Sequence, residues 1–370
     1  MSLVKQGLGA AAAVGVMVAA LTGAQAAPGD SANERLVVAW QGGATTLDPI
    51  MRSETTSYSW QRHVFDLLTM PNREGGIDPR IVTAWKNVDP KTWRLTLRSD
   101  VKFHDGSMMT ADDVGKSIMD AKENPKSQVK NFVINVTGYK VVDPTTIDVA
   151  FSVPDPIFPL HLDSIPLMPE ALIAKIGREA FDKHPVGSGP YQFEAWLAED
   201  HLDLKAWDGF WGKKPDFKFV RLESIPNDAT RLAALLSGQI QVAEKIGPSD
   251  FARVKNSGST HLTMVPGFRT MYLAMDAWRA TGTPGMASDA KNPFMDPRVR
   301  KAVYQSINVE LMREKIFNGA VTAASQFMPP HIEGHNDALK PFPYDVKALT
   351  KDCARCFWAN WSCSNKSLAT

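Results

Sequence analysis

One strand–helix–strand unit is visible in residues 219–242, FVRLESIPNDATRLAALLSGQIQV. Residues 219–225 have the pattern of a strand. Pro226-Asn227-Asp228 then leads into a helix with leucines at 232, 235 and 236, and Gly238 ends that helix. Residues 240–242 follow as a second strand. Because a strand, a helix and another strand follow one another so closely, the sequence predicts an α/β fold.

Similar patterns lie on both sides of this unit. Arg35–Trp40 (RLVVAW) is a short apolar run suited to a buried strand. Residues 58–70 place apolar side chains on one helical face and predict a helix. Alternation over Trp93–Leu97 predicts a strand, and Ser99-Asp100 after it suggests a hairpin. Val141–Phe151 reads as a turn followed by an alternating strand.

Further along the chain, capping residues mark three helix starts. Thr110 with Asp113 three residues later is a capping box. Asp296 precedes Pro297 at a first helical position, and Asn308 is expected to cap a helix that ends at Gly319. Residues 268–275 are again strand-like.

The first 26 residues have the features of a secretory signal peptide. Lys5 is the only charged residue before Asp30, residues 8–21 are almost entirely small or apolar, and Ala24-Gln25-Ala26 supplies a cleavage site. The alternative, a membrane anchor, is disfavoured because the apolar run is short and rich in Ala and Gly. We therefore expect export to the periplasm.

Composition excludes some functions and marks an anomaly near the end of the chain. The formal charge is +1, and the absence of a basic run argues against nucleic acid as a partner. All three cysteines, Cys353, Cys356 and Cys363, lie in the last 18 residues. The cysteine-free remainder fits a large periplasmic protein that is stabilised by its core rather than by disulfides.

Several segments, in this order, resemble one protein family. They are WRLTLRSDVKFHDGSMMTADDVGKSI (residues 93–118), VVDPTTIDVAF (141–151), PVGSGPYQF (185–193), WDGFW (207–211), LESIPNDATRLAALLSGQIQ (222–241) and FMDPRVRKAVYQSINVELMREKIFNG (294–319). They are similar to the extracellular solute-binding proteins of family 5, the peptide-, dipeptide- and nickel-binding components of ATP-binding-cassette importers. The resemblance implies an α/β, two-lobed periplasmic binding protein of type II, with an extra subdomain in the first lobe.

This resemblance also implies a division of the chain. We expect a signal peptide (1–26), a first-lobe core (27–57 and 185–266), a first-lobe subdomain (58–184), an incomplete second lobe (267–350) and an aberrant tail (351–370). From Lys351 the sequence departs from the family pattern, and we hypothesise a frameshift, a degraded gene or a sequencing error. With a second lobe that is cut short, the chain is expected to be unstable and to bind its ligand weakly or not at all.

Two segments are the candidate ligand-binding residues that the resemblance implies. The first is the loop Ser53, Glu54, Thr55 and Thr56, whose hydroxyls and N–H groups suit a peptide main chain. The second is the strand that begins Phe268, Arg269, Thr270 and Met271, whose backbone could pair with an extended ligand by strand addition. Arg269 could pair with a ligand carboxylate, although a solvated or internally paired arginine is the alternative.

Other motifs are interpreted as structural. His104-Asp105-Gly106 is expected to be a turn, and Gly187-Ser188-Gly189 lacks the strand–turn–helix context of a nucleophile elbow. His331 and His335 could share a metal, but no further ligand cluster is visible. Cys353 and Cys356 resemble half a zinc site or a redox pair, which alone is weak. We expect no metal, no cofactor and no catalytic residue.

The function implied by the resemblance is delivery of peptides, either di- or oligopeptides, to an importer by closure of a cleft. The expected partners are the peptide or another small solute and the permease subunits in the inner membrane, and the protein is expected to be a monomer. Nickel complexes, haem, glutathione and sugars remain alternative ligands. A secreted peptide hydrolase and a chaperone-like or receptor module are rival functions.

Overall fold

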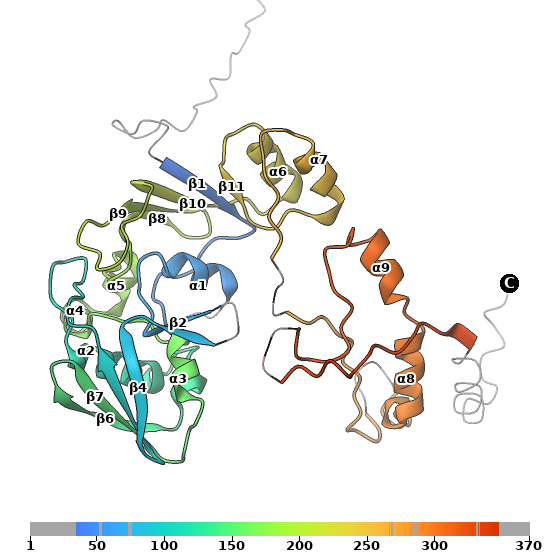
Figure 1. The fold of residues 1–370 in the computed structure, drawn as a ribbon, viewed down its shortest axis with the longest axis horizontal. Coiled ribbons are helices and arrows are strands. Elements are labelled where there is room, and N and C mark those ends of the chain that lie inside the picture. Colours follow the sequence, from blue (N-terminus) through green and yellow to red (C-terminus); the bar gives the residue numbers. More distant parts are fainter. Residues whose placement is uncertain are drawn as a thin grey trace, which may run out of the picture.

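The structure is a computed structural model that describes residues 35–51, 54–72, 76–265, 267, 269–282, 285, 287–330, 332 and 334–347. The predicted signal peptide and the predicted aberrant tail lie outside the described residues. Two parts can be distinguished in Figure 1: a first part of residues 35–263 and a second part of residues 264–347, joined by the chain that follows α7 (Phe251–Lys255).

A five-stranded sheet forms the upper half of the first part (Figure 1). Its order is β11-β1-β10-β9-β8, and β1 pairs in parallel with both β10 and β11. The bounds are β1 Arg35–Trp40, β8 Tyr191–Leu197, β9 His201–Ala206, β10 Phe219–Ser224 and β11 Val242–Ala243. The strand–helix–strand unit expected from residues 219–242 is therefore confirmed.

The helix of this unit begins and ends where its sequence predicts. In α6 (Asp228–Leu236) the side chain of Asn227 accepts a hydrogen bond from the Thr230 amide at 2.9 Å. Gly238 follows the helix with a φ of +80°, a conformation that only glycine adopts without strain. Leu232 is buried, and Ala234 packs with Ile240 beside β1.

A four-stranded antiparallel sheet forms the lower half, in the order β4-β5-β7-β6. Its strands are β4 Val82–Asp89, β5 Thr92–Leu97, β6 Val136–Asp143 and β7 Thr146–Phe151. Every second residue of β7 is buried, which is the expected alternation. Against the sheet packs α2 (Ala111–Glu123), whose capping box of Thr110 and Asp113 is present with both of its hydrogen bonds.

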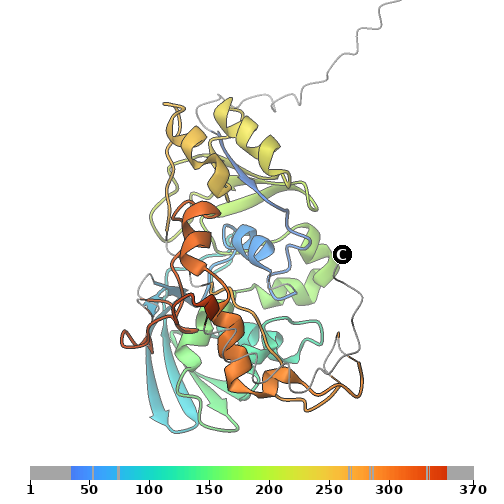
Figure 2. The ribbon, with the colours of Figure 1, turned by 90° about the vertical axis from the view of Figure 1, so that its right-hand side faces the viewer.

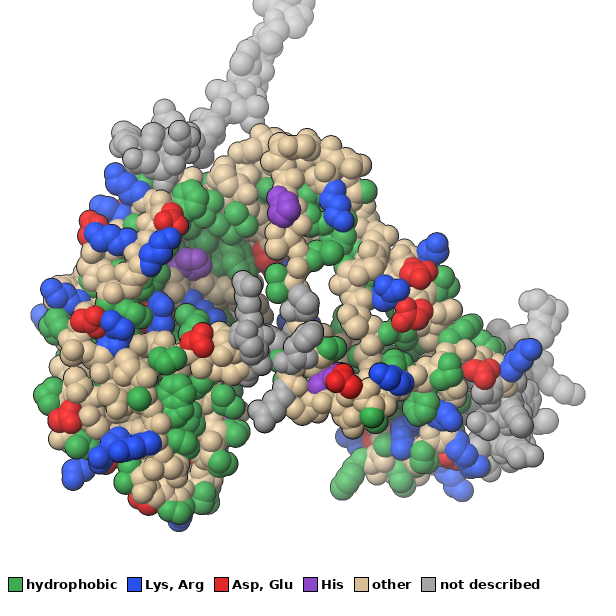
Figure 3. Space-filling model, in the orientation of Figure 1, with side chains coloured by type: hydrophobic (Ala, Val, Ile, Leu, Met, Phe, Trp, Pro, Cys, Tyr) green, Lys and Arg blue, Asp and Glu red, His purple; other side chains and the backbone are tan. Residues whose placement is uncertain are grey.

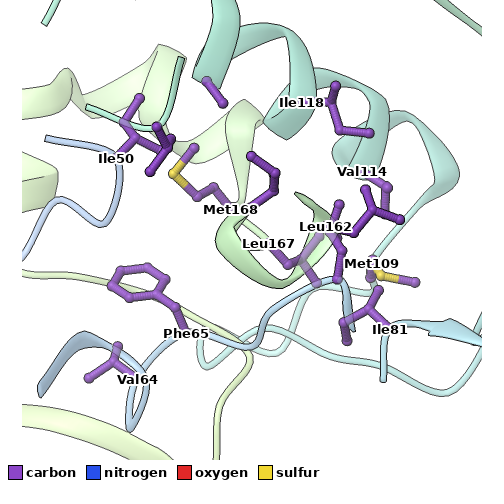
Figure 4. Close-up of a cluster of buried hydrophobic side chains, with 14 of the residues drawn as sticks. Ile50, Val64, Phe65, Ile81, Met109, Val114, Ile118, Leu162, Leu167 and Met168 are labelled. Atoms are coloured by element: carbon purple, nitrogen blue, oxygen red, sulfur yellow. The ribbon is translucent and has the colours of Figure 1, made fainter. Parts of the chain in front are cut away.

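One hydrophobic core runs through both halves of the first part. Figure 4 shows a portion of it, in which side chains from α2 lie close to side chains from the segment that leads into α4. The residues labelled there are Ile50, Val64, Phe65, Ile81, Met109, Val114, Ile118, Leu162, Leu167 and Met168.

The remaining elements connect these sheets and form the second part. They are α1 Thr55–Gln61, β2 Thr69–Pro71, β3 Ile77–Pro79, α3 Phe158–His161, α4 Glu170–Ile176, α5 Arg178–Lys183, α8 Pro297–Gln305, α9 Val309–Lys315 and the 3-10 helices Lys130–Val133, Leu162–Ser164, Pro248–Asp250 and Pro293–Met295. None of the helices in the described ranges combines the length and the apolar composition that a membrane span requires.

Two local predictions in the first part are wrong. The helix expected over residues 58–70 ends at Gln61, because the carbonyls of His63 and Val64 accept hydrogen bonds from the amides of Tyr191 and Gly189. The hairpin at Ser99-Asp100 is absent, because β5 pairs with β4 and β7 instead. In both cases tertiary partners determine the local structure.

A cluster of charged and aromatic side chains joins the two sheets. The buried carboxylate of Asp66 accepts hydrogen bonds from Arg80 at 2.6 Å and 2.9 Å and from Trp211 Nε1 at 2.8 Å. The guanidinium carbon of Arg98 lies 4.0 Å from the centre of the Trp211 ring, a cation–π distance. Since Arg80 and Arg98 flank the four-stranded sheet and Trp211 follows β9, this cluster fixes one sheet against the other.

The second part is built differently from the first. The caps Asp296 and Asn308 of α8 and α9 are confirmed, since each side chain accepts an amide hydrogen bond. The strand predicted over residues 268–275 is wrong: among the described residues after 263 there is no strand at all. A strand requires a hydrogen-bonded neighbour, and no described segment supplies one. Of the hydrophobic residues described here, Val299 and Ala302 are buried.

Glu170, the first residue of α4, is predicted to make stability depend on pH. Burial, and next the carboxylate of Asp120, raise its pKa to about 7, and its Oε1 has no hydrogen-bond partner among the described residues. Because the pKa of Glu170 is higher in the folded state than in the unfolded state, the protonated carboxyl contributes to the stability of the fold. This contribution is complete below the unfolded pKa and is lost as pH rises through about 7.

We expect Glu170→Gln to raise the free energy of unfolding at pH 8 by about 2 kcal/mol and to change it little at pH 5. Urea denaturation of the full chain at both pH values measures this. An equal effect at pH 5 and pH 8 would contradict the assignment.

Gly187 is predicted to tolerate no side chain. A Cβ at this position would lie 2.0 Å from the carbonyl oxygen of Val64, which is backbone and cannot move aside. We expect Gly187→Ala to destabilise the chain by about 1–3 kcal/mol. Gly138→Ala in β6 is the control, because its Cβ would meet nothing within 4 Å, and we expect a change within about 0.5 kcal/mol. Equal denaturation midpoints for the two variants would refute this prediction.

Candidate functional site

An open hollow separates the two parts of the molecule, as Figure 3 shows. Seen from the side of the second part, α8 and α9 lie in front of the first part (Figure 2), and α1 lies on the face of the first part that is turned toward them (Figures 1 and 2). The structure thus places α1 at the wall of the hollow. Both candidate segments adjoin this region: one leads into α1, and the other follows the crossing between the parts.

The first candidate segment is partly helical, not a loop as predicted. Ser53 lies outside the described residues, Glu54 is the N-cap of α1, and Thr55 and Thr56 form its first turn. Glu54 Oε1 accepts hydrogen bonds from Thr45 Oγ1 at 3.1 Å and from Ser57 Oγ at 2.8 Å. Thr55 is exposed and Thr56 half-buried, and neither hydroxyl is bonded to another described residue. Both are therefore free to bind a ligand.

One carboxylate of α5 accepts three hydrogen bonds from the loop that precedes α1. Asp182 Oδ1 accepts hydrogen bonds from Thr46 Oγ1 at 2.6 Å and from the amides of Leu47 and Asp48 at 2.7 Å and 2.8 Å. Gln61 of α1 donates back to the carbonyls of Thr46 at 3.0 Å and Asp48 at 3.2 Å. These hydrogen bonds hold the start of α1 in place. A site that is already ordered favours binding, because little conformational entropy is lost when the ligand binds.

The sequence did not indicate the role of Asp182 or the hydrogen bonds that its carboxylate accepts. Asp182 lies in α5, more than 130 residues from the loop that it holds. Asp48 also pairs with Arg178 at 2.8 Å across a separation of 130 residues. No local pattern indicates contacts of this range, so no sequence signal could have found them.

The second candidate segment forms neither a helix nor a strand and has few contacts. Phe268 lies outside the described residues, and Arg269 is exposed without an ion pair to any described residue. Thr270 Oγ1 donates to the Phe327 carbonyl at 3.1 Å, and the rings of Tyr272 and Phe327 lie 4.6 Å apart. Met271 is 82% exposed. No main-chain group of residues 269–275 is hydrogen-bonded to another described residue.

The structure brings together Glu54, Thr55 and Thr56 at one helical turn, and it brings Thr270 to Phe327. No hydrogen bond or ion pair joins these two groups within the described part of the chain. They belong to separate parts of the molecule, and a ligand that touched both would have to bridge the hollow between them.

His104 is structural, as expected. Its Nε2 lies 3.0 Å from the Gly189 carbonyl, and its Nδ1 accepts a hydrogen bond from the Gly187 amide at 3.3 Å. Burial lowers the pKa of His104 to about 4. The ring is therefore neutral at physiological pH, and it fastens the turn at residues 104–106 to the glycines that precede β8.

For the metal candidates, His331, Cys353 and Cys356 lie outside the described residues. His335 Nδ1 lies 2.7 Å from the Met328 carbonyl. No group of three or more metal-binding side chains occurs within the ranges that the structure describes.

The described residues thus form a first part with two main sheets and a second part with helices only, on either side of an open hollow (Figure 3). Residues 76–352 match the bacterial extracellular solute-binding proteins, family 5 (middle), and the chain belongs to this family. The fold is that of the two-lobed, type II periplasmic binding proteins, of which the chain covers a part. The resemblance recognised in the sequence is confirmed.

Curated relatives support the same assignment. The chain is 28% identical over 317 residues to the glutathione-binding protein GsiB of Salmonella paratyphi A, an alignment covering 84% of this chain and 59% of the relative. It is 27% identical over 302 residues to the dipeptide-binding protein of Escherichia coli K12, covering 74% of this chain and 54% of the relative. The chain thus spans less than two thirds of the length of these relatives.

Solved structures share the fold. The periplasmic binding protein DppA of Helicobacter pylori, in complex with the peptide STSA, has a TM-score of 0.69 and 22% identity, with 88% of this chain and 66% of that chain covered. NikZ of Campylobacter jejuni, in complex with Ni(L-His), has a TM-score of 0.71 and 21% identity, with 87% and 63% covered. These two proteins carry different ligands on one architecture.

Proposed function

We propose that this protein is the periplasmic substrate-binding component of an ATP-binding-cassette importer and that it captures di- or oligopeptides between its two parts. The observation that carries the proposal is the main chain of residues 269–275, which has no hydrogen-bonded partner among the described residues. An extended peptide can pair with such a segment by strand addition, which reads the peptide backbone whatever its side chains.

Charge at the second candidate segment fits a short peptide. Arg269 presents an exposed guanidinium there. A peptide carries a carboxylate at one end, which can pair with this guanidinium. The hydroxyls of Thr55 and Thr56 add hydrogen-bonding groups for the peptide amides.

The mechanism is closure about the connection between the parts. A peptide bound to one part gains further contacts when the other part swings onto it, and this difference in contact energy stabilises the closed state. Exclusion of water from the hollow then strengthens each polar contact. The permease subunits of the importer would recognise the closed form. No covalent step is involved, so the protein acts as a binding protein and not as an enzyme.

The periplasmic location rests on the signal peptide expected at residues 1–26 and on the periplasmic binding proteins that share the fold. We expect the protein to act there as a monomer. Glutathione, which is itself a peptide, and metal complexes are the alternative ligands that the names of relatives suggest. A secreted peptide hydrolase is the rival from another class, and cleavage of an added peptide mixture would favour it.

Ligand-observed NMR on the full chain tests the proposal, because saturation transfer detects weak binding. We expect transfer to short peptides and none to a neutral sugar of similar size. Thr55→Val with Thr56→Val should weaken peptide binding several-fold, since each lost hydrogen bond contributes about 0.5–1.5 kcal/mol.

The matched control is Thr137→Val, which alters an exposed threonine of β6 in the four-stranded sheet. This variant should bind as the unaltered chain does. Absence of transfer to every peptide would overturn the proposed function. If the control variant lost as much peptide binding as the double variant, α1 would not be part of the binding site.

A further inference from the structure

Arg231 of α6 is buried to an unusual degree for an arginine. Its side chain is 1% exposed, and it is among the largest fully buried side chains of the described residues. Arginine is almost never fully buried unless its charge is paired. Its only carboxylate partner among the described residues is Asp228, which it contacts at 2.6 Å and whose own side chain is 60% exposed.

The other donors of Arg231 all point to main-chain carbonyls. Nη1 donates to Ile225 at 2.6 Å and to Pro226 at 3.4 Å, directly after β10. Nε donates to Glu244 at 3.0 Å and Nη2 donates to Lys245 at 2.8 Å, directly after β11. One guanidinium therefore ties together the segments that leave the carboxyl ends of two strands.

The second of these segments, directly after β11, is where the chain leaves the five-stranded sheet. Beyond Lys245 the chain runs through α7 and then crosses to the second part (Figure 1). Lys245 itself has a φ of +55°, a left-handed conformation that is strained for a residue other than glycine. The bond from Arg231 to its carbonyl, and a bond from Lys245 Nζ to Gln41 at 3.2 Å, hold it there.

The geometry requires arginine rather than a generic buried residue. A planar guanidinium reaches carbonyls on two sides at once, which the single ammonium of lysine cannot do. An apolar side chain would fill the same space at a lower desolvation cost, but it would leave the four carbonyls without this donor. Packing alone therefore does not account for the buried charge, whereas the hydrogen bonds to these carbonyls do.

We propose that Arg231 is a positioning residue of the hinge: it fixes the direction in which the chain leaves the five-stranded sheet, and so the orientation of the second part relative to the first. The inference rests on the proposed closure, because a defined hinge is useful only if the two parts move against each other. Beyond that closure, the side chain of Arg231 and the four carbonyls that it contacts are assigned as the groups that define the hinge.

Distances between spin labels in the full chain test this directly. With Cys353, Cys356 and Cys363 replaced by serine, Lys126→Cys and Ser306→Cys carry one label on each part. Lys126→Cys with Asp208→Cys gives a reference pair inside the first part. All distances are measured without peptide, so the outcome does not depend on whether peptides bind.

We expect Arg231→Lys and Arg231→Met to broaden the distance distribution between the parts about twofold and to leave the reference pair unchanged. The control is Arg221→Lys on β10, which alters a paired arginine (2.6 Å to Asp203) of the same sheet and should change neither distribution. If Arg231→Met does not fold, Arg231→Lys decides the question.

If Arg231→Lys left the width of the label-to-label distance distribution between the two parts unchanged, the proposal would be overturned. Equal broadening of both label pairs would also overturn it, because that result means general loosening of the first part. Peptide binding can fail while the widths respond as expected, and this combination would count against the proposed function alone.

Discussion

Parallel pairing of β1 with β10 and β11 is the interaction on which the rest of the described structure depends. It joins residues 35–40 to residues more than 180 positions later, and it closes everything between them into one unit. The loop before α1, the four-stranded sheet and the hairpin of β8 and β9 all lie within this closure. Because the pairing is parallel, the carboxyl ends of the three strands meet at one edge, where the chain crosses to the second part.

The two parts differ in how far their main-chain groups are paired. In the first part, side chains complete what the strands leave open: Asp182 accepts amides of the loop before α1, and Arg231 donates to carbonyls after β10 and β11. In the second part, residues 269–275 have no main-chain partners among the described residues. The two candidate segments therefore differ in hydrogen bonding: the loop before α1 is bonded to distant side chains, and residues 269–275 leave their main-chain groups open to a ligand.

The sequence predicted what depends on neighbours along the chain. Strand β1, helix α6 with its stop at Gly238, and the caps at Thr110, Asp296 and Asn308 follow from local patterns and are confirmed. The prediction of a helix over residues 58–70 is wrong because amides of residues far away in the sequence donate hydrogen bonds to its carbonyl groups. The strand over residues 268–275 failed because an apolar alternation predicts a strand only where a partner strand exists.

The candidate site was predictable only in outline. Resemblance to the family placed Glu54, Thr55 and Thr56 in it, but the helical turn that they form and the carboxylate of Asp182 behind them come from contacts across more than 130 residues. Arg231 carries no sequence signal for its role, because α6 alone does not reveal which carbonyls its side chain will meet. Contacts between residues so far apart in the sequence can be identified only from the three-dimensional structure.

Amide hydrogen exchange on the full chain, read out by mass spectrometry, tests the central pairing most directly. We expect slow exchange for peptides that cover β1 and β10, since their amides are paired within the sheet, and fast exchange for peptides that cover residues 269–275. Equal protection of residues 269–275 and of β1 would refute this difference in pairing.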